Sequence, residues 1–315
     1  YEDTELVSRI TETERLHQQA WNKVLYKSDA GLHGVTPWYA EDYDDSDWEK
    51  VDMFSDNWAI RNGRPLNGVH WFRKDFFVPE DWSGKEAVLR LGCIVDADSV
   101  FVNGHFVGTV SYQYPPRIYK VPSKLLKKGK NQLTVRLFSY GGRPSFVKEK
   151  PYKLICDGKE VNLEGGWKHK IGTVMPPSPS STAFHYTPVG LYNGMIYPLR
   201  HYTFKGVVWY QGESNVGRWS EYSSLLSALI ADWRTLFKDE NLPFYIIELA
   251  DFLAPDDPGR AAWAELRKQQ AKTARENAHV TLIKNSDTGE WNDIHPLDKK
   301  TAATRLVEAV IQNEK

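Results

Sequence analysis

The fold is decided by three short, mostly apolar runs: GVVWY at 206–210, FYIIEL at 244–249 and HVTLIK at 279–284. Runs this short and this rich in β-branched and aromatic residues are typical of strands that are buried on both faces. Segments with helical periodicity follow the runs at 220–237, 260–277 and 298–313. Strand–helix repetition of this kind predicts right-handed βαβ units and a parallel sheet covered by helices.

The predicted parallel sheet is thin, because its three strands fall short of the five or six that are about the usual number. Residues 1–26 have the pattern of one amphipathic helix, in which apolar residues such as Ile10 and Trp21 recur at roughly helical spacing. No strand precedes that helix in the sequence. We therefore expect the first strands of the α/β domain to come from a segment upstream of these residues.

Between residues 31 and 151 the pattern changes to short alternating runs separated by turn residues. The clearest predicted strands are 69–77, 87–91, 99–102, 105–108 and 131–138. Asn103-Gly104 predicts a type I′ hairpin, because both central residues of that turn need a positive φ. Several short strands at such spacing favour a β-sandwich or jelly roll.

The sequence therefore divides into three parts. Residues 1–30 are predicted to be a helical part of the α/β domain, 31–151 an inserted β-sandwich, and 152–315 the rest of the α/β domain. A chain of 315 residues is long enough for both domains, since a typical domain has about 100–150 residues.

The charged residues are balanced, with 40 Lys and Arg against 41 Asp and Glu. Nucleic-acid and membrane-surface partners usually need a basic excess, so the composition favours neither, and no apolar run is long enough to span a bilayer. Cys93 and Cys156 are too few for a disulfide framework or a metal cluster. Twelve Trp and sixteen Tyr offer flat faces that suit both sugar stacking and sheet cores.

Two groups of polar residues follow predicted parallel strands. They are Gln211-Gly212-Glu213-Ser214-Asn215, directly after the first apolar run, and Asn292-Asp293-Ile294-His295-Pro296, in the loop after the third. Ligands gather at the carboxyl ends of the strands in open parallel sheets. Both groups are therefore candidate site residues.

Asp293 and His295 suit acid–base chemistry. An Asp two residues from a His, in a loop closed by Pro296, can orient an imidazole that acts as a general base. Asp293 suits the role of a helix cap or turn former as well, given Pro296 and the helix beyond it. The position after a parallel strand favours the functional interpretation.

The other group suits the positioning of a substrate. Gly212 leaves room for a ligand at its backbone N–H, which can help to bind an oxyanion. Gln211, Glu213 and Asn215 supply polar groups that can orient a substrate or a catalytic neighbour. A polar strand-to-helix turn with Ser214 or Asn215 as the helix cap explains the same residues without a function.

The run KGVVWYQGESN at 205–215 resembles a block typical of the bacterial sialate O-acetylesterases, which are SGNH-type hydrolases. The similarity continues in PVGLYNGMIYPL at 188–199, DWR at 232–234, LPF at 242–244 and DIHP at 293–296. It implies a flavodoxin-like three-layer α/β domain whose first strands are missing here. It also implies hydrolysis of acetyl esters on sugar hydroxyls, with His295 as the general base, Asp293 orienting it, and no metal or other cofactor.

Part of the middle block has a resemblance of its own. Leu91-Gly92, Val102-Asn103-Gly104, Arg117-Ile118-Tyr119 and Gly129-Lys130-Asn131 look like parts of the galactose-binding-like jelly rolls attached to β-galactosidases and β-glucuronidases. Such a module is found as an insertion in larger members of the esterase family. The resemblance implies that it acts as a scaffold, shapes the cleft, or binds sugar.

The nucleophile of the resembled family lies in a Gly-Gln-Ser-Asn block after the first strand, and that block does not occur in this sequence. We therefore expect the serine on an N-terminal segment of the same precursor, upstream of Tyr1. Ser214 is an alternative, because the chain order Ser, Asp, His matches an α/β-hydrolase. The Gly-x-Ser-x-Gly elbow is incomplete, however, since Val216 stands where the closing Gly would be.

The substrate that the resemblance implies is an acetylated sugar or sialoglycan. A periplasmic or secreted bacterial location is expected from that substrate class. The alternative is a non-catalytic carbohydrate-binding or scaffold protein that uses the aromatic face of residues 31–151. The lack of a recognisable nucleophile in the sequence supports this alternative.

Overall fold

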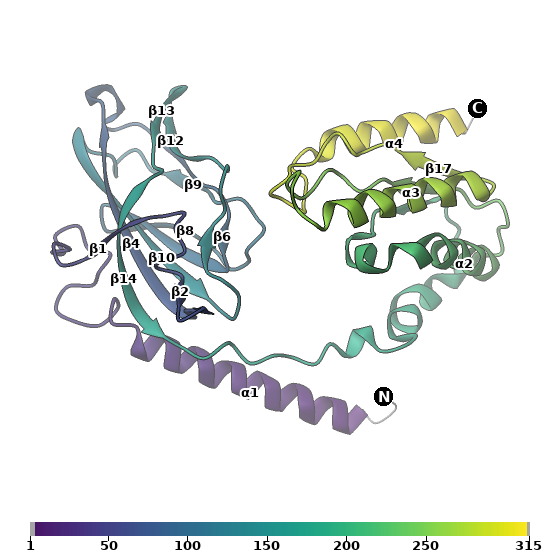
Figure 1. The fold of residues 1–315 in the computed structure, drawn as a ribbon, viewed down its shortest axis with the longest axis horizontal. Coiled ribbons are helices and arrows are strands. Elements are labelled where there is room, and N and C mark those ends of the chain that lie inside the picture. The colour runs from purple at the N-terminus through teal and green to yellow at the C-terminus, as the bar shows by residue number, and fades with distance from the viewer. Residues whose placement is uncertain (1–3, 314–315) are drawn as a thin grey trace. The chain divides into compact units, whose positions relative to one another are not determined.

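The computed structural model describes residues 4–313 and divides into two units, of which the first ends at Thr182 and the second begins at Ala183 (Figure 1). Residues 1–3 of the predicted first helix and residues 314–315 of the predicted last part lie outside the described range. Each unit has a hydrophobic core and sheets of its own.

Two antiparallel sheets make up most of the first unit (Figure 1). The larger has the order β1-β14-β4-β10-β7-β8, with β1 (Glu49–Asp52), β4 (Gly68–Val78), β7 (Ala97–Val102), β8 (His105–Val110), β10 (Gly129–Ser139) and β14 (Gly166–Val174). The smaller has the order β13-β12-β5-β9, with β5 (Ala87–Leu91), β9 (Ile118–Val121), β12 (Tyr152–Cys156) and β13 (Lys159–Asn162). Shorter elements complete the unit: β2 (Ile60–Arg61) paired with β3 (Arg64–Pro65), β6 (Ile94–Val95) paired with β11 (Ser145–Phe146), and a single helical turn at Glu80–Trp82.

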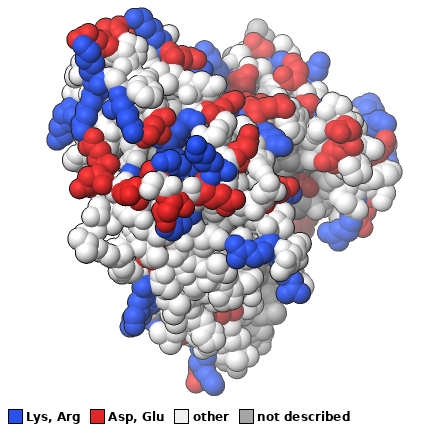
Figure 2. Space-filling view, turned by 60° about the vertical axis from the view of Figure 1, so that its left-hand side comes forward, with Lys and Arg blue, Asp and Glu red and all other residues white. Residues whose placement is uncertain are grey.

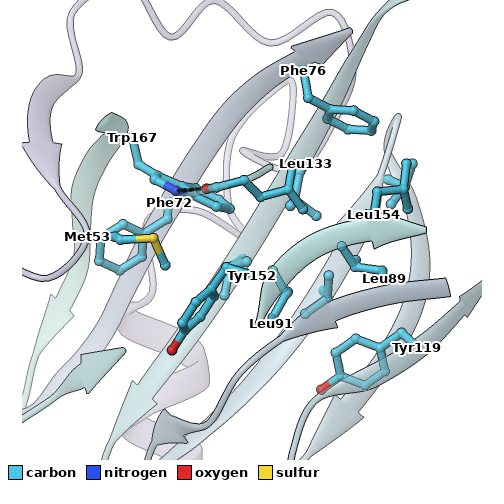
Figure 3. Packing of buried hydrophobic residues seen from close by; sticks show 14 of the residues in the cluster. Met53, Phe72, Phe76, Leu89, Leu91, Tyr119, Leu133, Tyr152, Leu154 and Trp167 are labelled. Atoms are coloured by element: carbon cyan, nitrogen blue, oxygen red, sulfur yellow. Dashed lines mark hydrogen bonds between the residues drawn. The ribbon is translucent and has the colours of Figure 1, made fainter. Parts of the chain in front are cut away.

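The two sheets enclose one core and form a β-sandwich. Phe72 and Leu133 come from the larger sheet, Leu89 and Leu154 from the smaller, and Figure 3 shows their side chains in the space between the sheets. All four are at most 1 % exposed. Alternate residues of a strand point to the same face, so alternating apolar residues bury one face of each sheet. Burial of each such side chain contributes about 1.5–3 kcal/mol.

The strands predicted in the middle of the sequence are confirmed. They correspond to β4, β5, β7, β8 and β10. The predicted hairpin is confirmed as well: Asn103 and Gly104 have φ values of 48° and 79° and connect β7 to β8. Turn chemistry and alternation, which are both local features, were sufficient to find these elements.

The antiparallel sheets extend beyond residue 151, where the sequence predicted the sandwich to end. β12 pairs with β5, and β14 pairs with β1 and β4. β14 lacks a run of alternating apolar residues, because two of its buried positions hold His169 and Gly172, and Lys168 and Lys170 stand beside His169. The pattern that identified the earlier strands was therefore absent.

Helix α1 (Thr4–Ser28) packs on the sandwich through its last turns. Trp21 and Leu25 are buried there. Asp29, directly after the helix and fully buried, accepts hydrogen bonds from Trp71 Nε1 (2.8 Å) and Arg136 Nε (2.7 Å) of the larger sheet. The helix therefore belongs to the first unit, whereas the sequence assigned residues 1–30 to the α/β part.

The second unit contains a parallel sheet with the order β15-β16-β17, formed by β15 (Val207–Trp209), β16 (Phe244–Ile247) and β17 (Val280–Ile283). Its long helices are α2 (Trp219–Phe237), α3 (Arg260–Glu276) and α4 (Lys299–Asn313). Single helical turns lie at Phe184–Tyr186, Tyr192–Ile196, Tyr197–His201 and Glu213–Arg218. The predicted strands and long helices are confirmed with ends that agree to within two residues. Within residues 4–313, no further strand joins this sheet.

The central strand β16 is buried on both faces. Phe244 and Ile246 pack in a cluster with α2 and α3, whereas Tyr245 and Ile247 pack in a cluster with α4. Helices thus cover both faces, as the continuous apolar character of the strand predicted. The second unit is a mixed α/β structure.

Charged side chains of both signs are interspersed on the surface drawn in Figure 2, and neither sign forms a continuous field there. This distribution agrees with the balance of charges in the sequence. Among the described residues, no helix combines the length and the apolar character that crossing a membrane requires.

Two stacked histidines lie in the interior of the sandwich. His70 Nε2 donates to the carbonyl of Leu66 (2.8 Å), so its Nδ1 accepts the proton that His169 Nε2 donates (3.0 Å). A hydrogen bond between two ring nitrogens needs at least one of the rings to be neutral, because a protonated ring has no acceptor nitrogen. Burial lowers the pKa of His70 to about 4 and that of His169 to about 3.

The free energy of unfolding should fall as the pH drops from about 6.5 to about 4. An unfolded histidine titrates near pH 6.5, whereas folded His70 stays neutral to about pH 4, so the unfolded state binds more protons in this window. The expected loss from His70 alone is on the order of 3 kcal/mol, and His169, whose pKa is lowered as well, adds to it. Urea unfolding at a series of pH values measures it. His105→Gln, at an exposed histidine, should leave the dependence unchanged, and a stability that stays flat over this window contradicts the prediction.

Candidate active site

The residues that follow the three parallel strands are joined to one another. Asn285, after β17, donates through Nδ2 to the carbonyl of Glu248 (3.1 Å), after β16, and to the hydroxyl of Tyr210 (3.4 Å), after β15. The Glu248 carboxylate accepts the backbone N–H groups of Asn285 and Ser286, both at 3.1 Å. These contacts connect the strand ends into one polar edge of the sheet.

Buried donors hold the turn after β15 in place. The carbonyl of Gln211 accepts hydrogen bonds from the Tyr222 hydroxyl (2.9 Å) and from Gln270 Nε2 (3.2 Å). Gln270 also accepts the backbone N–H of Leu249 (2.9 Å), so this one side chain clamps the ends of β15 and β16. Burial raises the pKa of Tyr222, which keeps its hydroxyl protonated as a donor.

The predicted positioning residues form local hydrogen bonds with each other. Gln211 Nε2 donates to Asn215 Oδ1 (2.8 Å), and the backbone N–H of Gly212 donates to the carboxylate of Glu213 (2.9 Å). Gly212 has a φ of 155°, and a Cβ at this position would lie 2.8 Å from a methyl group of Leu266. Backbone conformation and space both favour glycine here.

The second motif forms a tight turn. The backbone N–H of His295 donates to Asp293 Oδ1 (2.9 Å), and that of Asp293 donates to the carbonyl of Glu290 (3.1 Å). Asp293 is buried, with 5 % of its surface exposed, whereas His295 is exposed. Asp293 therefore acts as a turn former, and the turn presents the imidazole at the surface of the unit.

A contact between loops holds this turn against the strand ends. The backbone N–H of Leu253, in the loop after β16, donates to the carbonyl of Trp291 (2.9 Å). Gly289 lies so close to the backbone of Asp251 that a Cβ there would be 2.0 Å from the Asp251 carbonyl oxygen. The loops after β16 and β17 are thus packed backbone to backbone.

Ser214 is exposed in the helical turn after Gly212. In the part of the chain that the structure describes, its hydroxyl makes no hydrogen bond, to a histidine or to any other group. A nucleophilic serine is normally activated by a base within hydrogen-bond reach. The arrangement gives Ser214 no such base.

Sequence reasoning missed four residues of this edge: Tyr222, Glu248, Gln270 and Asn285. Gln270 could have been found, because it lies on the buried stripe of α3 with Trp263 and Leu266, where a polar side chain needs a partner. Glu248 was included in an apolar run, and nothing local marks its carboxylate as the acceptor of two N–H groups from another loop. Within residues 4–313, no cluster of three or more His, Cys, Asp or Glu could hold a metal ion.

Residues 9–168, about half of the chain, match the family described as "Glycosyl hydrolases family 2, sugar binding domain". Residues 167–312 match the family described as "Carbohydrate esterase, sialic acid-specific acetylesterase". The chain belongs to the first of these families through residues 9–168, and residues 167–312 are similar to the second. The resemblance to sialate O-acetylesterases that the sequence motifs indicated is confirmed.

Curated relatives of the acetylesterase family are similar to part of this chain. The sialate O-acetylesterase of Mus musculus is 33 % identical over 136 residues, which are 37 % of this chain and 24 % of the relative. That of Rattus norvegicus is 32 % identical over 174 residues, which are 50 % of this chain and 30 % of the relative. The matched segments thus span about a quarter to a third of the length of these relatives.

A solved carbohydrate acetylesterase from Xanthomonas citri is 20 % identical and aligns over 76 % of this chain and 70 % of its own, with a TM-score of 0.37. A score this low does not establish a shared arrangement. Both polar motifs, at 211–215 and 292–296, fall inside the segment that matches the acetylesterase family.

Gln270→Leu should lower the free energy of unfolding by about 1–3 kcal/mol, because the buried N–H of Leu249 loses its acceptor and the Gln211 carbonyl loses a donor. Urea unfolding of the 315-residue chain, read from the transition of the second unit, measures the change. Gln269→Leu is the matched control, since that neighbouring side chain is only partly buried and does not bond to the strand ends. Equal stability of the two variants would show that Gln270 does not clamp the strands.

Proposed function

We propose that the chain is part of a carbohydrate O-acetylesterase whose acid–base residues are His295 and Asp293. The observation that carries the proposal is the turn in which buried Asp293 fixes the backbone of exposed His295, on the loop after β17 of the acetylesterase domain. The domain would have the flavodoxin-like three-layer arrangement of SGNH hydrolases, with the sandwich as an inserted galactose-binding-like jelly roll.

In the proposed reaction a serine oxygen attacks the acetyl carbonyl carbon while His295 accepts the serine proton. The C–O bond to the sugar then breaks, and the imidazolium returns its proton to the leaving sugar oxygen. Water attacks the acetyl-serine in the same way and releases acetate. Asp293, whose Oδ1 accepts the backbone N–H of His295, would orient the imidazole and offset its charge.

The oxyanion would be bound near Gly212, with the side chain amides of Gln211 and Asn215 beside it. The Gly212 N–H is bonded to the Glu213 carboxylate, so binding of an oxyanion requires that carboxylate to turn away. Glu213 would then be free to accept a hydrogen bond from a substrate hydroxyl. No metal takes part in this mechanism.

The serine would come from an upstream segment that also completes the sheet. β15 is an edge strand, and Val208 within it is 51 % exposed. Other large apolar side chains before and after this strand are exposed as well: Tyr186, Val189, Leu191, Met195, Tyr197, Leu199, Tyr202 and Tyr210. Exposed apolar surface of this extent on one short segment favours a further layer of chain that covers it.

The substrate would be an acetylated sugar or sialoglycan, as the family description and the names of the relatives suggest. A periplasmic or secreted bacterial location agrees with that class of substrate. The domain similar to the sugar-binding domain of glycosyl hydrolases would shape the cleft or hold the glycan.

The 315 residues alone should hydrolyse 4-nitrophenyl acetate little or not at all, since the proposed nucleophile belongs to the upstream segment. A longer polypeptide that restores the upstream segment should be active, and His295→Ala in it should lower kcat by about a thousandfold or more. Initial rates of the three proteins test this. Full activity of the 315 residues alone would refute the upstream nucleophile.

Covalent labelling distinguishes the two candidate serines. A fluorophosphonate should label the active longer polypeptide at a serine upstream of residue 1, and Ser214→Ala should label as strongly as the unchanged protein. Mass spectrometry of the labelled peptide identifies the residue. Loss of labelling in Ser214→Ala would make Ser214 the nucleophile.

A further inference from the structure

One lysine close in sequence to the second polar motif contacts the residue that directly precedes the first. Lys299 begins α4, four residues after His295, and Tyr210 directly precedes Gln211. Lys299 Nζ lies 3.3 Å from the Tyr210 hydroxyl and 4.9 Å from the centre of its ring. The pair therefore stands at the carboxyl end of the sheet, between the turn after β15 and the loop that carries the histidine.

The charge of Lys299 has no carboxylate partner among the described residues. The acidic side chains of the neighbouring loops are bonded elsewhere. Glu248 accepts two backbone N–H groups, Asp287 pairs with Arg305 (2.6 Å), and Asp298 accepts the N–H and hydroxyl of Thr301. Tyr210 supplies only a hydroxyl and a ring face, so the ammonium group can receive an anion.

The position of Lys299 also opposes the local preference of a helix. Lys299 and Lys300 stand in the first turn of α4, which contains no acidic residue. A cation at the N-terminus of a helix faces the positive end of the helix dipole, which costs about 0.3–1 kcal/mol. Departures from local preference are expected mainly where a residue serves a function.

We propose that Lys299 and the Tyr210 hydroxyl form the subsite that binds the carboxylate of an acidic acetylated sugar. This inference rests on the proposed function, because it gives the site an acidic sugar as its substrate. The ammonium group supplies one charge-assisted hydrogen bond and the phenol supplies a second donor. One cation with one neutral donor matches a singly charged carboxylate, whereas sites for phosphate groups gather more donors or charges.

Binding of non-acetylated ligands tests the subsite without any hydrolysis. The probes are N-acetylneuraminic acid and its methyl ester, which differ in the carboxylate, titrated into the 315-residue chain and followed by NMR. The unchanged chain should bind the acid about tenfold more tightly than the ester, which is the preference expected of one charge-assisted hydrogen bond. Lys299→Met should abolish this preference, and Lys299→Arg should keep it.

Lys300→Met is the matched control, because this exposed neighbour has the same charge and the same helix but does not contact Tyr210. It should bind both ligands as the unchanged chain does. Equal binding of acid and ester by the unchanged chain, or a preference that survives in Lys299→Met, would overturn the subsite. A preference for the acid that is lost in Lys299→Met supports the subsite even if the longer polypeptide fails to hydrolyse esters. The subsite and the proposed esterase function can therefore fail independently of each other.

Discussion

Parallel pairing of β15, β16 and β17 is the constraint on which the candidate site depends. In a parallel sheet all carboxyl ends lie on the same edge, so residues far apart in the sequence are delivered to one place. Tyr210, Glu248 and Asn285 each follow one of the strands and are bonded to one another there. If one of the three strands ran in the opposite direction, the residue that follows it would lie at the opposite edge of the sheet.

The strand ends are fixed by buried polar groups, and this explains how exposed residues can be held in place. Gln270 satisfies a carbonyl at the end of β15 and an N–H at the end of β16, and Glu248 satisfies two N–H groups after β17. Leaving such groups without partners would cost about 1–3 kcal/mol each. The side chains of Gln270 and Glu248 therefore hold the loops on which Gln211 and His295 stand.

The turn that Asp293 forms is compatible with the orienting role proposed for it, although the sequence offered the two as alternatives. Its carboxylate forms the turn, and a carboxylate has enough acceptor capacity to receive a second donor. A turn former and an orienting residue are thus compatible in one side chain. In the sandwich, too, one buried carboxylate serves more than one donor. Asp29 accepts hydrogen bonds from Trp71 and Arg136 and fixes the end of α1.

The sequence by itself determined the parallel strands, the long helices, the hairpin at Asn103-Gly104 and the two polar motifs, because periodicity and turn chemistry act over a few residues. Only the tertiary structure decided that β14 joins the larger sheet, since buried His169 carries no apolar signal. It also decided that α1 packs on the sandwich. It likewise decided that Gln270 bonds to Gln211, a residue 59 positions away, and that Lys299 faces Tyr210, 89 positions away. Such contacts depend on how the elements pack, and no local pattern encodes them.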